Sequence, residues 1–228
     1  GLFKIVGLEL SDDNRLALMG YKEPEECFLF DLESKQKPLR LSSHQLADPV
    51  FRTAAFSLKK GLALTAGRKS VCLWDLKTGS LQKEIQVTVP GSTGVGCMQV
   101  LPGGEQVLIL GACVLQIYHL ETRECTLTLR EKAIQGLGMA VSEDGRYVLT
   151  EGHKLCLWDL RAGRCLRTFS EAQAGWGNIC TAFSADGKFG LSGGELSKVY
   201  LWKLHFPEMK KAGSLEFDLH PIIVKPPI

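Results

Sequence analysis

The feature of the sequence that most restricts its fold is a short motif that returns five times at nearly constant spacing. Each copy has an aliphatic residue, an aromatic residue, a polar residue and leucine, as in Leu-Trp-Asp-Leu at 73–76. The aromatic positions are 44, 44, 40 and 44 residues apart and are occupied by Phe30, Trp74, Tyr118, Trp158 and Trp202. A fixed period of this length indicates a chain built from similar structural units that pack on their neighbours.

Four short strands are predicted within each unit. The first strand ends in a tight turn, such as Val-Ser-Glu-Asp-Gly at 141–145 or Phe-Ser-Ala-Asp-Gly at 183–187, and Asp-Gly favours hairpin turns. A second apolar run, the aromatic segment and a fourth strand follow, the last after a turn such as Lys-Thr-Gly at 77–79. No helical period persists along the chain. The fold class predicted is therefore all-β, with four-stranded antiparallel units.

The same residues carry a family resemblance. The full motif is present as Trp74-Asp75 and Trp158-Asp159, and relaxed versions contain Phe30-Asp31, Tyr118 and Trp202. With the spacing and the Asp-Gly turns, these residues make the chain resemble the WD-repeat family. The resemblance implies a β-propeller of WD-repeat type with about five blades over residues 1–204, in approximate units 5–42, 50–89, 95–130, 136–170 and 178–219.

The chain also departs from that family pattern. A typical member has an Asp six residues before the aromatic and a Gly-His pair near the start of each repeat, which join a Ser or Thr and the Trp in a buried hydrogen-bonded network. Here the residues six before the aromatics are Pro24, Arg68, Ala112, Gly152 and Leu196, and only His44 resembles the opening His. We therefore expect the polar network to be missing or rudimentary, with stability coming mainly from buried apolar surface.

The number of repeats raises the question of completeness. The family usually closes its ring with seven blades, whereas five units fill this chain, which starts at Gly1 without an initiator Met. We expect a partial propeller or fragment of a larger protein, and keep a closed five-blade ring and completion by another chain as alternatives. Residues 205–228 are expected to hold the last outer strand, at 215–219, and an irregular tail rich in proline.

Charge and cysteine content narrow the class of protein. Lys and Arg number 27 and Asp and Glu 25, a formal net charge of +2 at pH 7, so no nucleic-acid footprint is expected. No apolar stretch approaches the roughly 18 residues of a membrane span, so no membrane partner is expected either. The eight cysteines form no CxxC or CxxxC pair, which argues against zinc and favours reduced core thiols. We expect an intracellular, cytoplasmic protein, with the nucleus as the alternative compartment.

The sequence contains no complete catalytic motif, which favours a protein that is not an enzyme and needs no cofactor or metal. The segment from Gly61 to Ser70 departs from a phosphate loop in its spacing and has no following helix. Gly94-Val95-Gly96 lacks the third glycine of a dinucleotide loop. No Gly-x-Ser-x-Gly is present, and the histidines show no metal-ligand spacing. Catalytic, cofactor-binding and metal residues are therefore all expected to be none.

The function predicted is a non-catalytic platform for protein–protein interaction, a scaffold or adaptor that binds proteins or peptide segments through its loops. Candidate contact residues on predicted loops are Arg68, Lys69, His153, Lys154 and Trp176. For Trp176, packing under the adjacent unit is the alternative to a partner contact. Two other functions stay open: a C-terminal sensor or autoinhibitory propeller of a large nucleotide-switch protein and, with less support, a propeller enzyme.

Overall fold

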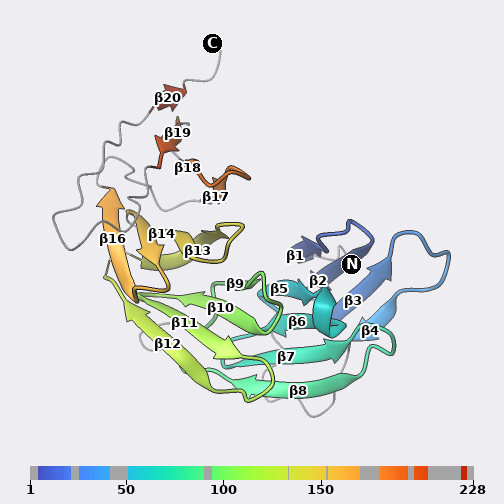
Figure 1. The fold of residues 1–228 in the computed structure, drawn as a ribbon. Helices are drawn as coiled ribbons and strands as arrows, with labels where there is room; N and C mark the ends of the chain where they lie inside the picture. The colour runs from blue at the N-terminus through green and yellow to red at the C-terminus, as the bar shows by residue number, and fades with distance from the viewer. Residues whose placement is uncertain are drawn as a thin grey trace. The chain divides into compact units, whose positions relative to one another are not determined.

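The computed structural model describes residues 5–21, 26–41, 51–89, 94–132, 134–152, 154–169, 180–194, 198–204 and 222–224. These residues form five four-stranded antiparallel sheets. In every sheet the strands follow one another in chain order, so that each strand pairs with the next (Figure 1). The all-β class and the four-stranded antiparallel units predicted from the repeats are confirmed. In the described residues, the helical structure is a single 3-10 turn at Leu58–Lys60.

The first three sheets belong to one compact unit, residues 1–130. The first sheet contains β1 (Ile5–Leu10), β2 (Leu16–Tyr21), β3 (Glu26–Asp31) and β4 (Leu39–Leu41). The second contains β5 (Thr53–Ser57), β6 (Leu62–Ala66), β7 (Ser70–Asp75) and β8 (Leu81–Gln86). The third contains β9 (Cys97–Val100), β10 (Gln106–Gly111), β11 (Val114–His119) and β12 (Cys125–Arg130).

The last two sheets form a second compact unit, residues 131–228. The fourth sheet contains β13 (Ile134–Val141), β14 (Tyr147–Gly152), β15 (Leu155–Asp159) and β16 (Arg164–Phe169). The fifth contains β17 (Cys180–Phe183), β18 (Phe189–Gly194), β19 (Lys198–Lys203) and β20 (Ile222–Val224). The last outer strand was predicted at 215–219, which lies outside the described residues. The outer strand of this sheet, which pairs with β19, is β20.

A turn with a recurring set of hydrogen bonds joins the first and second strands of several sheets. Ser142 Oγ accepts the backbone N–H of Tyr147 at 2.9 Å and donates to Asp144 Oδ1 at 2.6 Å. The same arrangement surrounds Ser11 and Ser184. Every first turn also has one residue with positive φ, from 57° to 76°, at Asn14, Gly61, Gly104, Gly145 and Gly187. These left-handed positions favour Gly and Asn, which is why the Asp-Gly signal predicted the hairpins.

Apolar faces of neighbouring sheets pack together inside each unit. The first strands of adjacent sheets are in contact, β1 with β5, β5 with β9, and β13 with β17. The middle strands are buried along their length, as in β7 and β10, whereas fourth strands such as β12 are mostly exposed. Burial of the middle strands accounts for their continuous apolar sequences, because both faces are covered.

One close contact joins the first two sheets. The ring of Phe51 packs on Gly7 and Gly20, which are paired across β1 and β2. A Cβ atom added at Gly20 would lie 2.1 Å from Phe51 Cδ1. Because the two glycines have no side chains, they leave the space that the phenylalanine ring occupies.

The aromatic positions of the repeat lie in the third strand of each sheet. Trp74, Trp158 and Trp202 are each 1% exposed. Their indole Nε1 atoms donate to the hydroxyls of Thr65, Thr150 and Ser192, each at 2.9 Å. This pair is the part of the expected polar network that the described residues contain, so the network is rudimentary.

Sheets without tryptophan also lack the hydroxyl. The strand register places Ile109 where Thr65 would be for Tyr118, and Met19 at the same place for Phe30. The polar acceptor thus accompanies the indole donor, as expected if buried polar groups must be paired.

The cysteines are less uniformly buried than predicted. All eight are free thiols, and Cys72 and Cys156 occupy the core as expected from their apolar surroundings. Cys113, Cys125 and Cys180 are exposed, which corrects the prediction of core thiols. Cys125 begins the exposed fourth strand of its sheet, and Cys180 begins a first strand. Among the described residues, no helix has the length and apolar character required to cross a bilayer.

Candidate functional site

The strongest candidate site lies at one end of the strands. This end of each sheet carries the turn between the first and second strands and the turn between the third and fourth strands. We call this edge the turn edge. The hairpins between second and third strands lie at the opposite edge, because antiparallel strands reverse direction at each turn. The polar motifs of the repeat, at Ser11, Asp31 and their equivalents, all lie at the turn edge.

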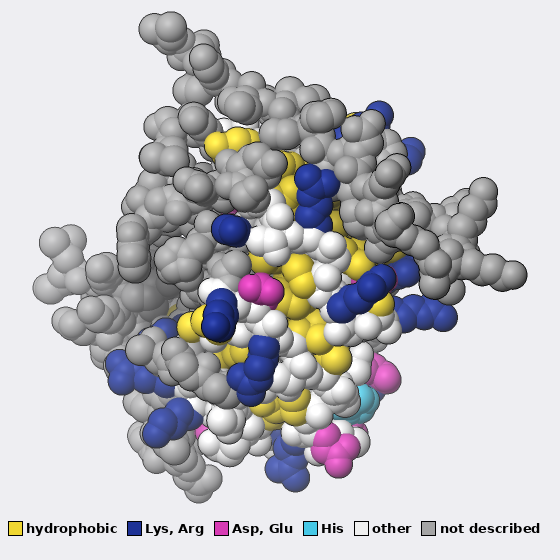
Figure 2. All heavy atoms as spheres, turned by 90° about the vertical axis from the view of Figure 1, so that its left-hand side faces the viewer, with side chains coloured by type: hydrophobic (Ala, Val, Ile, Leu, Met, Phe, Trp, Pro, Cys, Tyr) yellow, Lys and Arg dark blue, Asp and Glu magenta, His cyan; other side chains and the backbone are white. Residues whose placement is uncertain are grey.

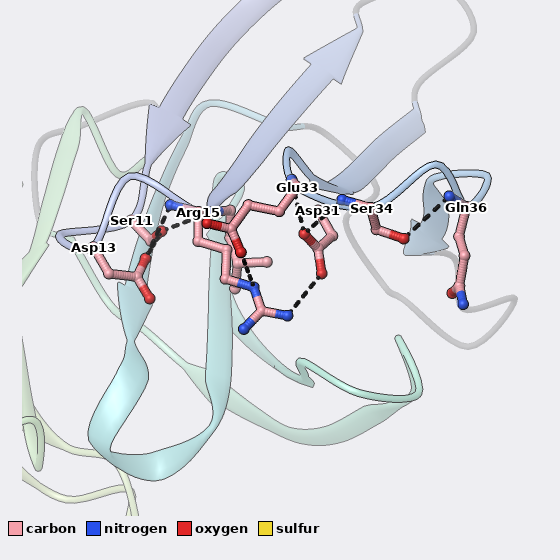
Figure 3. A network of polar contacts seen from close by, with 8 residues as sticks. Ser11, Asp13, Arg15, Asp31, Glu33, Ser34 and Gln36 are labelled. Carbon is pink, nitrogen blue, oxygen red and sulfur yellow. Dashed lines mark hydrogen bonds and ion pairs between the residues drawn. The ribbon is translucent and has the colours of Figure 1, made fainter.

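In the first sheet these motifs form one polar network (Figure 3). Asp13 accepts from the Ser11 hydroxyl at 2.5 Å and from the backbone N–H of Arg15 at 3.1 Å. The guanidinium of Arg15 extends from the first turn towards the second, where it donates to Asp31 at 3.1 Å and lies 3.7 Å from Glu33. Arg15 therefore ties the two turns of the sheet together.

Both aspartates are held in the ionised form. The Ser11 hydroxyl and the backbone N–H of Arg15 hold the pKa of Asp13 below its ordinary value. The hydrogen bond from Arg15 has the same effect on the pKa of Asp31, which also accepts the backbone N–H groups of Glu33 and Ser34. Carboxylates stabilised in this way are acceptors and poor proton donors at neutral pH.

A pocket of about 480 Å³ lies between this network and the second sheet. Its apolar lining is four leucines, Leu16, Leu29, Leu39 and Leu76. Its polar lining is Asp13, Arg15, Asp31, Gln36, Lys37 and Lys77. The leucines belong to the core between the first two sheets or pack against it. We call this cavity the first-sheet pocket.

Three cationic side chains, Arg15, Lys37 and Lys77, and two carboxylates, Asp13 and Asp31, line the pocket, so its net charge is positive. Lys37 and Lys77 are exposed, and within the described part of the chain neither forms an ion pair. Asp31, by contrast, is neutralised by Arg15. The pocket therefore combines an apolar lining with two cationic groups that are available to an anionic side chain.

A second hollow lies at the turn edge between the fourth and fifth sheets. It measures about 350 Å³ and lies between the first turns of both sheets, with Glu143, Asp144, Asp186 and Lys188 among its lining residues. Hollows between successive sheets thus recur at the turn edge. Their charges differ because the turn residues that line them differ between repeats.

The polar residue after each aromatic has a structural role in the second turn of its sheet. Asp75 Oδ1 accepts the backbone N–H groups of Lys77 and Thr78, at 3.0 and 2.8 Å. His119 uses Nδ1 in the same way, accepting from Glu121 and Thr122 at 3.2 and 3.3 Å. His119 therefore serves as an acceptor that replaces aspartate in this turn.

Asp159 combines this turn role with an ion pair. Its side chain is 6% exposed and lies 2.8 Å from Arg146 Nη2. Burial opposes ionisation of Asp159, but the hydrogen bonds from Arg146 and the backbone N–H of Ala162 outweigh it and lower the pKa. Arg146 and Asp159 thus repeat the link between turns made by Arg15 and Asp31.

The contact residues predicted from sequence do not line the first-sheet pocket. Arg68 and Lys69 lie in the hairpin between β6 and β7, and Lys154 lies in the hairpin between β14 and β15; all three are exposed. These hairpins are at the opposite edge of their sheets. His153 and Trp176 lie outside the described residues.

The pocket residues were missed because no single motif contains them. Lys37 belongs to the first sheet and Lys77 to the turn after β7, so they meet only when the two sheets pack. The available signal was the Ser-x-Asp turn followed by Arg15, repeated as Arg146 after Ser142. In the view of Figure 2 the Lys and Arg side chains of the described residues are dispersed among apolar and uncharged groups. The part of the chain that is described holds no group of three or more His, Cys, Asp or Glu placed to bind a metal.

Comparison with known proteins gave no assignment. No family model matches the chain, and no curated protein matches its sequence.

Proposed function

We propose that the chain is an array of WD-repeat-type propeller blades that serves as a non-catalytic platform for partner proteins. Three repeated features support this proposal: five successive four-stranded meanders, first strands in contact within each unit, and a buried indole paired with a hydroxyl in three sheets. Repeat arrays keep a constant core while their turns vary, which suits binding to extended partners.

The observation that carries a binding role is the first-sheet pocket. Four leucines provide apolar surface, and beside them lie Lys37 and Lys77, which form no ion pair with the residues that the structure describes. The ligand that fits is a peptide segment with acidic side chains next to an apolar one. Ion pairs would orient such a segment, and burial of its apolar side chain would supply affinity.

The pocket's carboxylates favour binding over acid–base catalysis. Proton transfer near neutral pH needs a group whose pKa is near the working pH. Asp13 and Asp31 instead have lowered pKa values, through Ser11 and Arg15 respectively. The Oδ1 atom of each aspartate is also engaged by turn hydrogen bonds, which suits a fixed wall of a binding site.

Peptide display on the whole chain tests the proposal. Peptides selected from a random library are expected to be enriched in Asp or Glu beside Leu, Ile or Phe. Binding of a selected peptide, measured by fluorescence anisotropy, should weaken about tenfold or more in the double variant Lys37→Glu/Lys77→Glu. The matched control is Arg68→Glu/Lys69→Glu, the same charge change at the opposite edge, for which less than about a twofold effect is expected.

The two variants separate the surfaces. A loss confined to Arg68→Glu/Lys69→Glu would move the binding surface to the opposite edge and reject the first-sheet pocket. A library that yields no enriched peptide at micromolar affinity would contradict the platform itself.

A further inference from the structure

Two cysteines of the fourth sheet lie close together on its outer strand pair. Cys156 is on β15 and Cys165 on β16. Thr168 Oγ1 lies 3.8 Å from the sulfur of each cysteine. Both thiols thus share one hydroxyl neighbour, and each shifts the pKa of the other.

A bulge in β16 produces this arrangement. Leu157 pairs with Arg167, but the next residue, Trp158, pairs with Cys165, so one residue of β16 is extra. Side chains alternate between faces along a regular strand, and an extra residue reverses that alternation. Cys165 thereby comes to the side of the sheet occupied by Cys156 and Thr168.

The two thiols differ in environment in a way that suits them to different roles. Cys156 is fully buried, whereas Cys165 is partly exposed. The interaction with the Cys156 thiol lowers the pKa of Cys165; Thr168 and the backbone of Arg167 act in the same direction, whereas burial and the nearby charge of Glu131 raise it. The same interaction, together with burial, raises the pKa of Cys156. Cys165 is thus the more nucleophilic thiol at neutral pH, and Cys156 stays a thiol beside it.

The third sheet provides an internal comparison. Cys125 on β12 has the place of Cys165, with Thr128 Oγ1 3.3 Å from its sulfur. The place of Cys156 is taken by Gln116, whose Nε2 lies 3.9 Å from the Cys125 sulfur. The bulge in β12 recurs at the same point of the strand pair. The third sheet therefore has the same geometry with one thiol instead of two.

We propose that Cys156 and Cys165 form a reversible thiol–disulfide redox site whose oxidant is a hydroperoxide. Cys165 is the attacking thiol and Cys156 the resolving thiol. The site is independent of the first-sheet pocket, since it belongs to the other compact unit.

The reaction balances in two steps with hydrogen peroxide. The Cys165 thiolate attacks one peroxide oxygen, the O–O bond breaks, and the hydroxide released takes up a proton to leave as water, giving a sulfenic acid. The Cys156 sulfur then attacks the Cys165 sulfur, the S–O bond breaks, and a second water leaves with the thiol proton. Two thiols and one peroxide thus give one disulfide and two waters, and an external dithiol reverses the change.

Peptide mass spectrometry after oxidation of the full chain tests the proposal. The purified protein is treated with equimolar hydrogen peroxide, alkylated under denaturing conditions and digested with trypsin. The expected product is a disulfide between peptides 155–161 and 165–167, lost on treatment with dithiothreitol. Cys125 should remain alkylated throughout, because it lacks a neighbouring thiol.

Three variants separate the roles of the two thiols. Cys156→Ser keeps a hydroxyl donor beside Cys165, so its sulfenic acid should form as fast as in the native chain but persist, and be trapped by dimedone. Cys156→Ala removes the donor, so oxidation of Cys165 should be severalfold slower. Gln116→Cys should gain a second disulfide, between positions 116 and 125. Thermal unfolding of each variant shows whether it is folded.

The result that would overturn the proposal is equally direct. If Cys165 stays reduced at a peroxide level that oxidises the exposed Cys113 or Cys180, or if it links mainly between chains, the site is not a redox pair. Failure of folded Gln116→Cys to form the new disulfide would contradict the geometric argument.

Discussion

Buried indoles are the residues on which the repeat depends most. Trp74, Trp158 and Trp202 each place an N–H group in an apolar core, and a threonine or serine hydroxyl accepts it. Such a donor costs free energy when it is unsatisfied, because it has left its water partners behind. The hydroxyl is therefore expected to matter through its hydrogen bond more than through its volume.

Substitution of Thr150 tests this role. Thr150→Val keeps the shape but removes the acceptor for Trp158 Nε1, and should lower the free energy of unfolding by about 1–3 kcal/mol. Thr150→Ser keeps the acceptor and should cost less than Thr150→Val. Urea unfolding followed by tryptophan fluorescence measures both. Equal losses in the two variants would show that the hydrogen bond contributes nothing.

Glu151 predicts a pH dependence of stability. Its side chain is 3% exposed, and Oε2 has no hydrogen-bond partner among the described residues. Burial raises its pKa from 4.5 to about 8, opposed by a hydrogen bond with Ser192. Between these values the folded chain holds a proton that the unfolded chain has released, so stability should fall as the pH rises from 5 to 8.

Glu151→Gln removes the titrating group while keeping the shape. The variant should therefore show a flatter dependence of the unfolding free energy between pH 5 and pH 8, and should gain on the native chain most at pH 8. Urea unfolding at pH 5, 6.5 and 8 gives the comparison. An unchanged slope in Glu151→Gln would mean that Glu151 is ionised at neutral pH in the folded chain.

At the scale of elements, the contact between the first two sheets depends on Gly20, which has no side chain and so leaves room for the ring of Phe51. Gly20→Ala would place a Cβ 2.1 Å from the ring of Phe51. The ring would have to move, at a cost of about 1–3 kcal/mol typical of overpacked cores. Gly103→Ala is the control, because an added Cβ there meets nothing within 4 Å.

A double-mutant cycle assigns the effect of Gly20→Ala to this contact. In a Phe51→Leu background the substitution should cost clearly less than in the native chain, since the smaller side chain leaves room for the methyl group. Chemical denaturation of the four chains supplies the cycle. Additive losses would place the strain elsewhere.

The strands were predictable from sequence because each is specified locally. An Asp-Gly turn at 144–145 fixes the first hairpin of its sheet through a positive φ at Gly145, and the Leu-Trp-Asp-Leu segment marks the third strand. The last strand was not predictable in this way. β20 contains only Ile222–Val224, and its pairing with β19 follows a long connection with no repeat motif.

At the scale of the whole molecule, the candidate site was beyond sequence reasoning. Neither Lys37 nor Lys77 alone indicates a binding site, and the sequence predicts the leucines of the pocket to be core residues. Their combination depends on how the first and second sheets pack, which is a property of three-dimensional structure. Exposed hairpins such as Arg68-Lys69 can be recognised in a sequence, which is why the contact residues were predicted at the opposite edge.

The central claim is the proposal that successive sheets of one compact unit are propeller blades with their first strands innermost. Distances between spin labels measured by pulsed electron paramagnetic resonance test it directly. Labels on noncanonical amino acids, which avoid the eight free thiols, would replace Glu9 and Gln99 on the first strands of the first and third sheets, and Arg40 and Thr128 on the outer strands of the same two sheets. Successive strands lie about 4.8 Å apart. The pair at 40 and 128 should therefore be at least about 10 Å further apart than the pair at 9 and 99, and equal distances, or the reverse order, would contradict a propeller arrangement.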